Sequence, residues 1–213
     1  MALGWSVACM TKRYAPATER NRDAILAVLQ TCLPPEGTVL EVSSGTGQHA
    51  AFFAPRLSPR WWLPTDLDRA NLASIAAWSE EIDALNLLPA QYLDVLDLLW
   101  SVEESVLPEP VSAIVNINMI HIAPWECAEA LFAGASRILQ GQSPVVIYGP
   151  FKRDGEHTAP SNAAFDEQLR AQDARWGVRD LEAVIDAATV CGFACQQITP
   201  MPANNLMVRF TSA

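Results

Sequence analysis

The sequence has no uninterrupted apolar run of the about 18 residues that a membrane-spanning helix requires, so we expect no membrane association. Basic residues are scarce: the chain has 14 Lys and Arg but 24 Asp and Glu, and its formal net charge is −10. Because a nucleic-acid surface needs a strongly positive potential, we expect a small-molecule or protein substrate and no bulk nucleic-acid binding. The sequence leaves the oligomeric state open.

Cysteine is also sparse, and its spacing is unlike that of a metal site. The five cysteines form no CxxC pair, and a zinc site at Cys191 and Cys195 would lack two further ligands. We therefore predict no metal site and free thiols in a reducing, cytoplasmic compartment. Residues 1–9 lack the basic segment and the length of a secretory signal. Residues 1–11 are predicted to be a disordered or alternative-start extension, with Met1 and Met10 as the two possible starts.

Half of the residues are hydrophobic, which is enough to form the core of one domain. We therefore predict a single domain spanning residues 1–213. Short β-branched or apolar runs alternate with longer segments whose apolar residues recur at helical spacing. Strands are predicted at 38–42, 60–65, 90–93, 111–118, 143–148, 194–199 and 206–211. Helices are predicted at 19–32, 47–56, 69–85, 124–139, 162–174 and 180–191.

This alternation is typical of a parallel sheet with helices on both faces. The link between the last two predicted strands, residues 200–205, is too short for a parallel crossover, so these strands should be antiparallel neighbours. We therefore predict an α/β, Rossmann-like fold of the class I methyltransferase type, with a mostly parallel seven-stranded sheet and a C-terminal antiparallel hairpin. Residues 150–177 are polar and rich in Pro and Gly, which favours a lid or substrate-facing insertion.

The first predicted strand ends in a candidate cofactor loop. Glu41 lies inside this strand, and Gly45 and Gly47 precede the next helix. Glycines at that point let the backbone pass close to a ligand, and the helix offers its N-terminus. Ser43 stands where the first glycine of such loops is usual. Taken alone, the loop is equally compatible with an ordinary glycine-rich turn.

Polar residues also end the next three predicted strands. Asp66 follows Glu41 by 25 positions, near the spacing of about 20 residues expected for a carboxylate that binds ribose hydroxyls. Asp94 can accept from an adenine amino group while the N–H of Val95 donates to the ring, although Asp94 could simply cap a turn. Asn116 is an unexpected polar residue in a buried strand unless it faces a pocket. Together, these positions predict an S-adenosylmethionine site, with S-adenosylhomocysteine as the product.

Six further motifs resemble one known family over nearly the whole chain. They are Tyr14–Asn21 (YAPATERN), Asn118–Trp125, Tyr148–Gly155 (YGPFKRDG), Ser161–Asp166, Arg175–Asp180 and Met201–Leu206. These motifs are similar to those of the methyltransferase-like protein 26 family. The resemblance implies the Rossmann-like methyltransferase fold and an S-adenosylmethionine site, and it implies no particular substrate.

Candidate catalytic residues lie after the fourth and fifth predicted strands. His121 is the best candidate base, and Tyr148 and Asn118 could line the acceptor pocket. Each of the three could instead brace a loop or pack in the core. Arg20, at the start of the first predicted helix, could pair with the cofactor carboxylate or simply face solvent.

The sequence thus predicts methyl transfer to an unidentified small-molecule or protein acceptor. A second reading is a cofactor-binding regulatory or interaction module without catalysis, motivated by the imperfect glycine motif. A third is an NAD(P)-dependent oxidoreductase, for which the position of the third fingerprint glycine is occupied by Ala50. The predicted terminal hairpin argues against this third reading.

Overall fold

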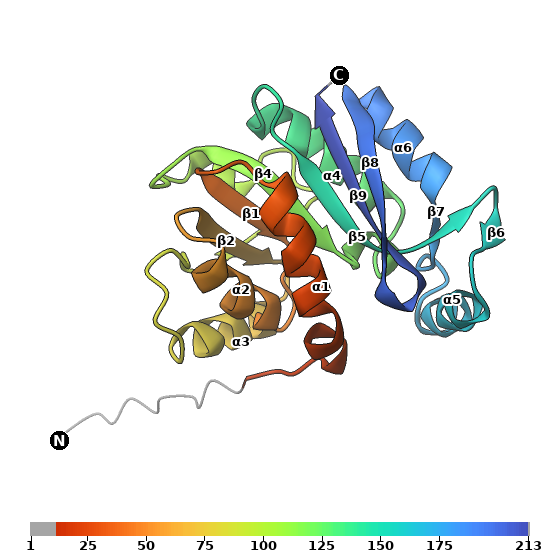
Figure 1. Ribbon diagram of the computed structural model, residues 1–213, viewed down its shortest axis with the longest axis horizontal. Coiled ribbons are helices and arrows are strands. Elements are labelled where there is room, and N and C mark those ends of the chain that lie inside the picture. Colours follow the sequence, from red (N-terminus) through yellow and green to blue (C-terminus); the bar gives the residue numbers. More distant parts are fainter. Residues whose placement is uncertain (1–11, 213) are drawn as a thin grey trace.

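The computed structural model describes residues 12–212 (Figure 1), so the predicted extension 1–11 and the choice of start lie outside it. The strands, in chain order, are β1 (Thr38–Val42), β2 (Trp61–Asp66), β3 (Gln91–Tyr92), β4 (Val111–Ile117), β5 (Val145–Arg153), β6 (Glu156–His157), β7 (Arg179–Asp180), β8 (Phe193–Met201) and β9 (Asn205–Ser212). The α-helices are α1 (Pro16–Cys32), α2 (Gln48–Phe53), α3 (Arg69–Ser79), α4 (Glu126–Ile138), α5 (Pro160–Gln172) and α6 (Leu181–Val190). Short 3-10 turns are η1 (Ala54–Arg56), η2 (Ser101–Glu104), η3 (Met119–His121) and η4 (Pro202–Asn204).

The main sheet has the strand order β3-β2-β1-β4-β5-β9-β8. Strands β1 to β5 run parallel, whereas β9 pairs antiparallel with both β5 and β8. The predicted mostly parallel α/β sheet with a C-terminal antiparallel hairpin is confirmed. Two short strands, β6 and β7, pair with the end of β5 and bring the total to nine in the described chain, against the predicted seven.

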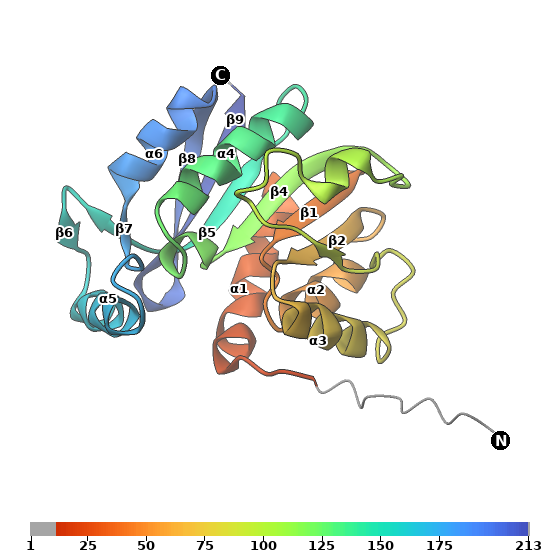
Figure 2. The same cartoon turned by 180° about the vertical axis from the view of Figure 1, so that it is seen from behind.

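Helices cover both faces of this sheet, and each face has its own apolar core. Helices α1, α2 and α3 lie on the face seen in Figure 1, and α4 and α6 lie on the other face, seen in Figure 2. The first core joins α1 and α2 to the sheet through side chains such as Ile25, Phe53 and Trp62. The second joins α4 and α6 to it through side chains such as Phe132 and Phe210. This layering directs the carboxyl ends of β1, β2, β4 and β5 to one edge.

Several helices and strands begin or end at residues other than the predicted ones, and three of these differences have a local physical reason. Helix α1 begins at Pro16, three residues before the predicted start, because the fixed φ of proline suits the first helical turn. Helix α3 ends at Ser79, well before the predicted 85, since the acidic residues Glu80 and Glu81 oppose the negative end of the helix dipole. Strand β5 continues to Arg153, because β9 pairs with it as far as Pro150, and β7 and β6 pair with its last three residues.

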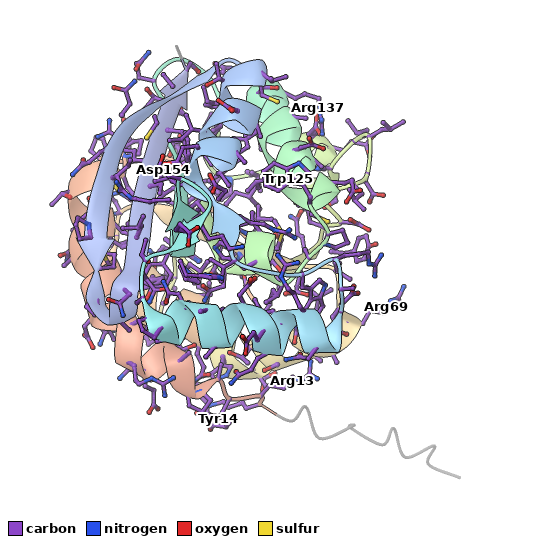
Figure 3. The ribbon with its side chains drawn as sticks, turned by 90° about the vertical axis from the view of Figure 1, so that its right-hand side faces the viewer. Arg13, Tyr14, Arg69, Trp125, Arg137 and Asp154 are labelled. Carbon is purple, nitrogen blue, oxygen red and sulfur yellow. The ribbon has the colours of Figure 1, made fainter. Side chains whose placement is uncertain are left out.

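The predicted insertion 150–177 therefore begins inside β5 and contains β6 and α5. Helix α5 crosses below the carboxyl edge of the sheet, as the side view of the molecule in Figure 3 shows. Asp166 anchors α5, since this buried carboxylate accepts from the Val178 N–H and lies 3.6 Å from Lys152 Nζ of β5. No helix among residues 12–212 combines the length and apolarity required to cross a membrane. Residues 12–212 also contain no group of three or more His, Cys, Asp or Glu arranged to hold a metal.

Candidate functional site

Three adjoining cavities lie at the carboxyl edge of the sheet. The central cavity, about 230 Å³, is lined by the ends of β1, β2 and β4 and by the start of α1. An apolar slot of about 90 Å³ shares Ser43, Met119 and Ile122 with it. A lateral cavity of about 380 Å³ shares Ala17, Asn21 and Asn118 with it, on the side of α5. The carboxyl edge of a doubly wound sheet is the usual place for a ligand in such folds.

Glu41 is a buried acid in the wall of the central cavity, with 1% of its surface exposed. Its Oε2 accepts hydrogen bonds from Ser44 Oγ and from Trp62 Nε1, both at 2.9 Å. Burial raises the pKa of Glu41 to about 7, against which these two hydrogen bonds act. A cationic ligand group in the cavity would favour the ionised carboxylate, so Glu41 suits an ammonium or sulfonium.

The raised pKa of Glu41 makes folding stability depend on pH. Between its ordinary value of 4.5 and about 7 the folded state holds a proton that the unfolded chain has lost, so stability falls as the pH rises through this window. Between pH 5 and pH 8, we expect the free energy of unfolding to fall by on the order of 2–3 kcal/mol less in Glu41→Gln than in the original protein. Urea unfolding of both proteins at the two pH values measures it. Equal pH dependence in both would contradict the prediction.

Asp66 lies across the same cavity, at the end of β2, and is 3% exposed. Its Oδ2 accepts from the Gly45 N–H at 2.8 Å, and its Oδ1 accepts from the Asp68 N–H at 2.9 Å and from Asn71 Nδ2 at 3.2 Å. The carboxylate therefore holds the glycine loop against β2. Because a carboxylate has about four acceptor sites, Asp66 retains capacity for a ligand hydroxyl.

Ser43 and Asn118 line the central cavity with left-handed backbone. Their φ angles are 62° and 66°, a region that favours glycine and, to a lesser degree, asparagine. Ser43 directly follows β1, and Asn118 directly follows β4. Such outliers persist where the surroundings over-determine them and cluster at ligand sites. Both positions thus turn the chain away from the sheet at the cavity floor.

Ser43 occupies the place that glycine usually takes in such loops, and its geometry predicts a stabilising substitution. Ser43→Gly removes the strain of a Cβ at φ 62°. Since glycine also gains unfolded-state freedom, we expect a net rise of only about 0.5–1 kcal/mol in the free energy of unfolding. Chemical denaturation measures it, with Ser44→Gly as control, because Ser44 lacks positive φ and bonds Glu41. A loss of stability in Ser43→Gly would show that the backbone there is unstrained.

The remaining predicted cofactor residues divide between the cavities and the structure behind them. Gly45 lines the central cavity and Val95 lines the apolar slot. Gly47 is at the start of α2 with φ 87°, where a Cβ would come within 2.7 Å of Ile75 Cα, so its role is close packing. Asp94 Oδ1 accepts from the Leu96 N–H at 3.0 Å, which makes it a turn cap beside the slot.

Asn116 and His121 are buried and are not among the residues that line these cavities. Asn116 Nδ2 donates to the Val42 carbonyl at 3.1 Å, and its Oδ1 has no hydrogen-bond partner among residues 12–212. His121 Nδ1 accepts from the Arg179 N–H at 3.3 Å, so the neutral ring carries its proton on Nε2, which has no partner in the same range. Burial, with the nearby Arg179 guanidinium, lowers the pKa of His121 to about 3. This imidazole is a much weaker base than the sequence suggested.

Tyr148 and Asn118, which are predicted to line an acceptor pocket, both line the lateral cavity. Burial raises the pKa of the Tyr148 phenol, and a side-chain hydrogen bond to Asn21 opposes part of the rise. Arg20, predicted as a possible partner of the cofactor carboxylate, also lines the lateral cavity and is not among the residues that line the central cavity. Its pairing with a cofactor carboxylate stays a prediction.

Asn21 belongs to the Tyr14–Asn21 motif and is a further polar residue of the candidate site, with no individual role predicted from the sequence. It lines both the central and the lateral cavity, and its Oδ1 lies 2.9 Å from His49 Nε2. Burial lowers the pKa of His49 to about 4, so the neutral ring donates to Asn21. This bond orients the Asn21 amide towards Tyr148. Helical periodicity could have found Asn21, since it lies one turn from Ala17 on the same face of α1.

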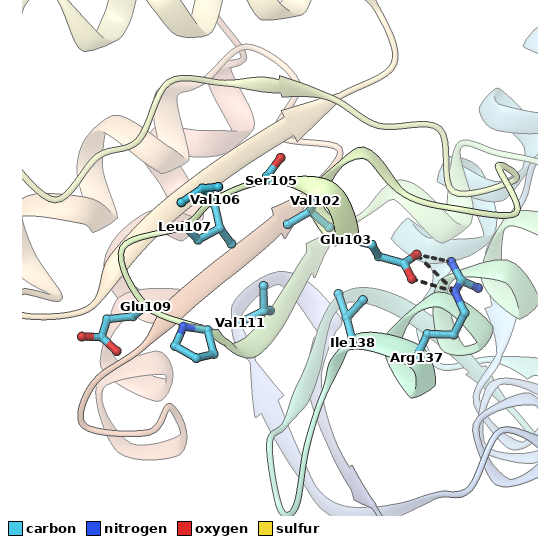
Figure 4. Close-up of a pocket in the computed structure, with 10 residues that line it drawn as sticks. Val102, Glu103, Ser105, Val106, Leu107, Glu109, Val111, Arg137 and Ile138 are labelled. Carbon is cyan, nitrogen blue, oxygen red and sulfur yellow. Dashed lines mark hydrogen bonds and ion pairs between the residues drawn. The ribbon is translucent and has the colours of Figure 1, made fainter.

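A larger hollow of about 530 Å³ lies at the other end of the molecule, beside the start of β4. Figure 4 shows its lining, in which the Arg137 guanidinium donates to the Glu103 carboxylate at 2.8–3.3 Å. Figure 3 places Arg137 opposite Arg13 and Tyr14, which lie near the carboxyl edge. Hydrogen bonding to Arg137 lowers the pKa of Glu103. This satisfied ion pair lies away from the strand ends, so we place the candidate site in the three smaller cavities.

Comparisons with known proteins agree with the geometry. The sequence profile of a family described as "Protein of unknown function (DUF938)" matches residues 12–212. This match does not confirm the resemblance to the methyltransferase-like protein 26 family, which stays a prediction.

Solved structures of methyltransferases share the fold at low sequence identity. The chain is similar to mitomycin 7-O-methyltransferase MmcR, with 11% identity and a TM-score of 0.74 over 92% of this chain and 54% of that chain. It is similar to the methyltransferase CalO1 in its SAH-bound form, with 14% identity and a TM-score of 0.69 over 89% and 54%. It is also similar to an O-methyltransferase family 2 protein from Planctomyces limnophilus in complex with apigenin, with 16% identity and a TM-score of 0.69 over 90% and 62%. The chain thus spans little more than half of the length of these proteins.

Proposed function

The chain belongs to the DUF938 family, and we propose that it is an S-adenosylmethionine-dependent methyltransferase that acts on a small molecule. The observation that carries this proposal is the continuity of the three cavities. An apolar slot, an acidic central cavity and a lateral cavity follow one another along the carboxyl edge of the sheet. A bound nucleoside with a cationic tail needs the first two, and an acceptor needs the third.

The residues present fit the adenosine part of the cofactor. The apolar slot, whose walls include Leu93, Val95 and Ile122, would take the flat adenine ring. Asp66, which can still accept a further hydrogen bond, would bind the ribose hydroxyls. Glu41 would pair with the ammonium group of the amino acid tail, because a cation beside this buried acid favours its ionised form against the rise in pKa that burial causes. The open space beside Gly45, where a Cβ would meet no atom within 4 Å, leaves room for the ligand.

Methyl transfer requires mainly positioning, because it is an in-line displacement. When bound, the cofactor would supply an electrophilic methyl group on a sulfonium. Asn21 and Asn118, at the junction of the central and lateral cavities, would orient the acceptor atom, and Tyr148 would form the wall behind it. A base is needed only where the acceptor must lose a proton.

We infer a positioning role for His121 rather than a base role. Its ring packs edge-on against Phe151 with centroids 5.1 Å apart, and its carbonyl accepts from the Gly177 N–H at 2.9 Å. Through these contacts His121 connects the loop after β4, which carries Asn118, to the segment that enters β7. In the proposed active site, this connection holds Asn118 in its left-handed conformation.

Titration calorimetry with S-adenosylhomocysteine tests the cofactor assignment, and transfer of a labelled methyl group to a small-molecule extract tests the activity. We expect one binding site per chain and labelled product in the small-molecule fraction. Absence of S-adenosylhomocysteine binding, or tighter binding of a nicotinamide dinucleotide, would contradict the proposal. Binding with no transfer to any fraction would favour the regulatory or interaction module instead.

A further inference from the structure

The lateral cavity differs in charge from the rest of this acidic protein. Arg20 is the charged residue that lines it, and no Asp or Glu of the described chain does. Its other polar lining groups are neutral amides and hydroxyls: Asn21, Asn118, Asn162, Asn205, Tyr148 and Ser161. In a chain of formal net charge −10, a cavity with a net positive lining is a local exception. It would attract anions and give no counter-ion to a cation.

The start of helix α1 adds to this positive potential. Ala17, in its first turn, lines the lateral cavity, and the N-cap Ala15 makes no side-chain hydrogen bond to the first-turn N–H groups. The uncapped turn carries a partial positive charge. Glu19, in the same turn, is exposed and is not among the cavity residues. The first turn of α1 thus borders both cavities, whereas Arg20 lines only the lateral cavity and the acids Glu41 and Asp66 line only the central one.

The walls of the lateral cavity are held together by hydrogen bonds between distant segments. Asn162 Nδ2 of α5 donates to the Asn204 carbonyl at 3.0 Å, and Asn204 Nδ2 donates to Ser161 Oγ at 3.2 Å. These bonds join α5 to the turn between β8 and β9. The cavity volume of about 380 Å³ lies within the range that small-molecule sites occupy. Phe165 and Pro150 provide an apolar wall for the body of such a molecule.

We propose that the methyl acceptor is a small organic anion whose carboxylate or equivalent group pairs with Arg20. This inference rests on the proposed function and names its substrate class. The apolar body packs against Phe165 and Pro150, and the nucleophilic oxygen or nitrogen points to the Asn21 and Asn118 junction. There, its lone pair forms the bond to the methyl carbon, and the carbon–sulfur bond breaks with its electron pair staying on sulfur. A proton on the acceptor atom leaves to water.

Three probes of similar shape test the charge preference: benzoate, benzyl alcohol and benzylamine. Each is titrated by NMR into the S-adenosylhomocysteine-saturated protein and into the protein alone, following the side-chain amide signals of Asn118 and Asn162. We expect benzoate to shift these signals and to bind at least about tenfold more tightly than the other two, as one charge-assisted hydrogen bond predicts. Arg20→Gln should remove this advantage. The matched control Arg153→Gln, at an exposed arginine outside the cavity lining, should retain it.

The two proposals fail separately in this experiment. Benzoate binding that is no tighter than that of benzyl alcohol, or that survives Arg20→Gln unchanged, overturns the anion assignment even where S-adenosylhomocysteine binds. Preferred binding of benzylamine overturns it as well. Absence of S-adenosylhomocysteine binding in the same samples overturns the proposed function. Benzoate binding that depends on Arg20 then supports an anion site at this cavity without methyl transfer.

Discussion

Replacing Asp66 with alanine is expected to weaken S-adenosylhomocysteine binding by about 100-fold or more, which corresponds to roughly 3 kcal/mol. The proposed ribose acceptor is lost, and so is the carboxylate that holds the Gly45 N–H at 2.8 Å and the Asp68 N–H at 2.9 Å. Each charge-assisted hydrogen bond contributes on the order of 1.5–3 kcal/mol. Both the ligand contact and the shape of the glycine loop therefore depend on this side chain. Calorimetry measures the affinity.

Asp68→Ala is the matched control, since Asp68 is exposed and caps α3 by accepting from the Ala70 N–H at 2.9 Å. It should lower the stability slightly through the lost helix cap and leave the cofactor affinity within a few-fold of the original. Asp66→Asn separates loop shape from charge, because its amide oxygen can still accept one loop N–H. Thermal unfolding of each variant verifies that it is folded. Unchanged affinity in folded Asp66→Ala would remove Asp66 from the proposed site.

Gly149→Ala should lower the free energy of unfolding by about 2–3 kcal/mol, the cost of overpacking a rigid core. A Cβ at this position would come within 2.4 Å of His121 Nε2 and 3.2 Å of Asn118 Oδ1. The imidazole cannot withdraw easily, because it packs on Phe151 and accepts from the Arg179 N–H. Urea denaturation measures the loss of stability.

A double-mutant cycle with His121→Ala tests this physical cause. Since the smaller side chain removes the clash, the added methyl group should cost at least about 1 kcal/mol less in the His121→Ala background. Additive losses would show that Gly149 is required for another reason. The conservative control Ala194→Gly, in β8 and remote from His121, tests whether a single methyl change in the sheet has a comparable effect.

The parallel sheet, the helix layers and the terminal hairpin followed from local patterns. Apolar runs alternating with amphipathic helices define a parallel sheet, and the short link between the last two strands forces them to be antiparallel. Because parallel strands end at one edge, Glu41, Asp66 and Asn118 could be grouped before any contact was known. The predicted end of β5 at Tyr148 is wrong, because pairing with three other strands extends β5 through Gly149 and Pro150 to Arg153.

The sequence by itself therefore determined the fold and the strand ends at which the candidate site lies. Only the tertiary structure decided which side chains share a cavity. Packing of the segment before β7 buries His121 and depresses its pKa, and the rotation of α1 brings Asn21 to the junction while Arg20 lines the lateral cavity alone. Such burial depends on contacts between segments remote in sequence, as between Arg179 and His121. Local periodicity carries no information on these contacts.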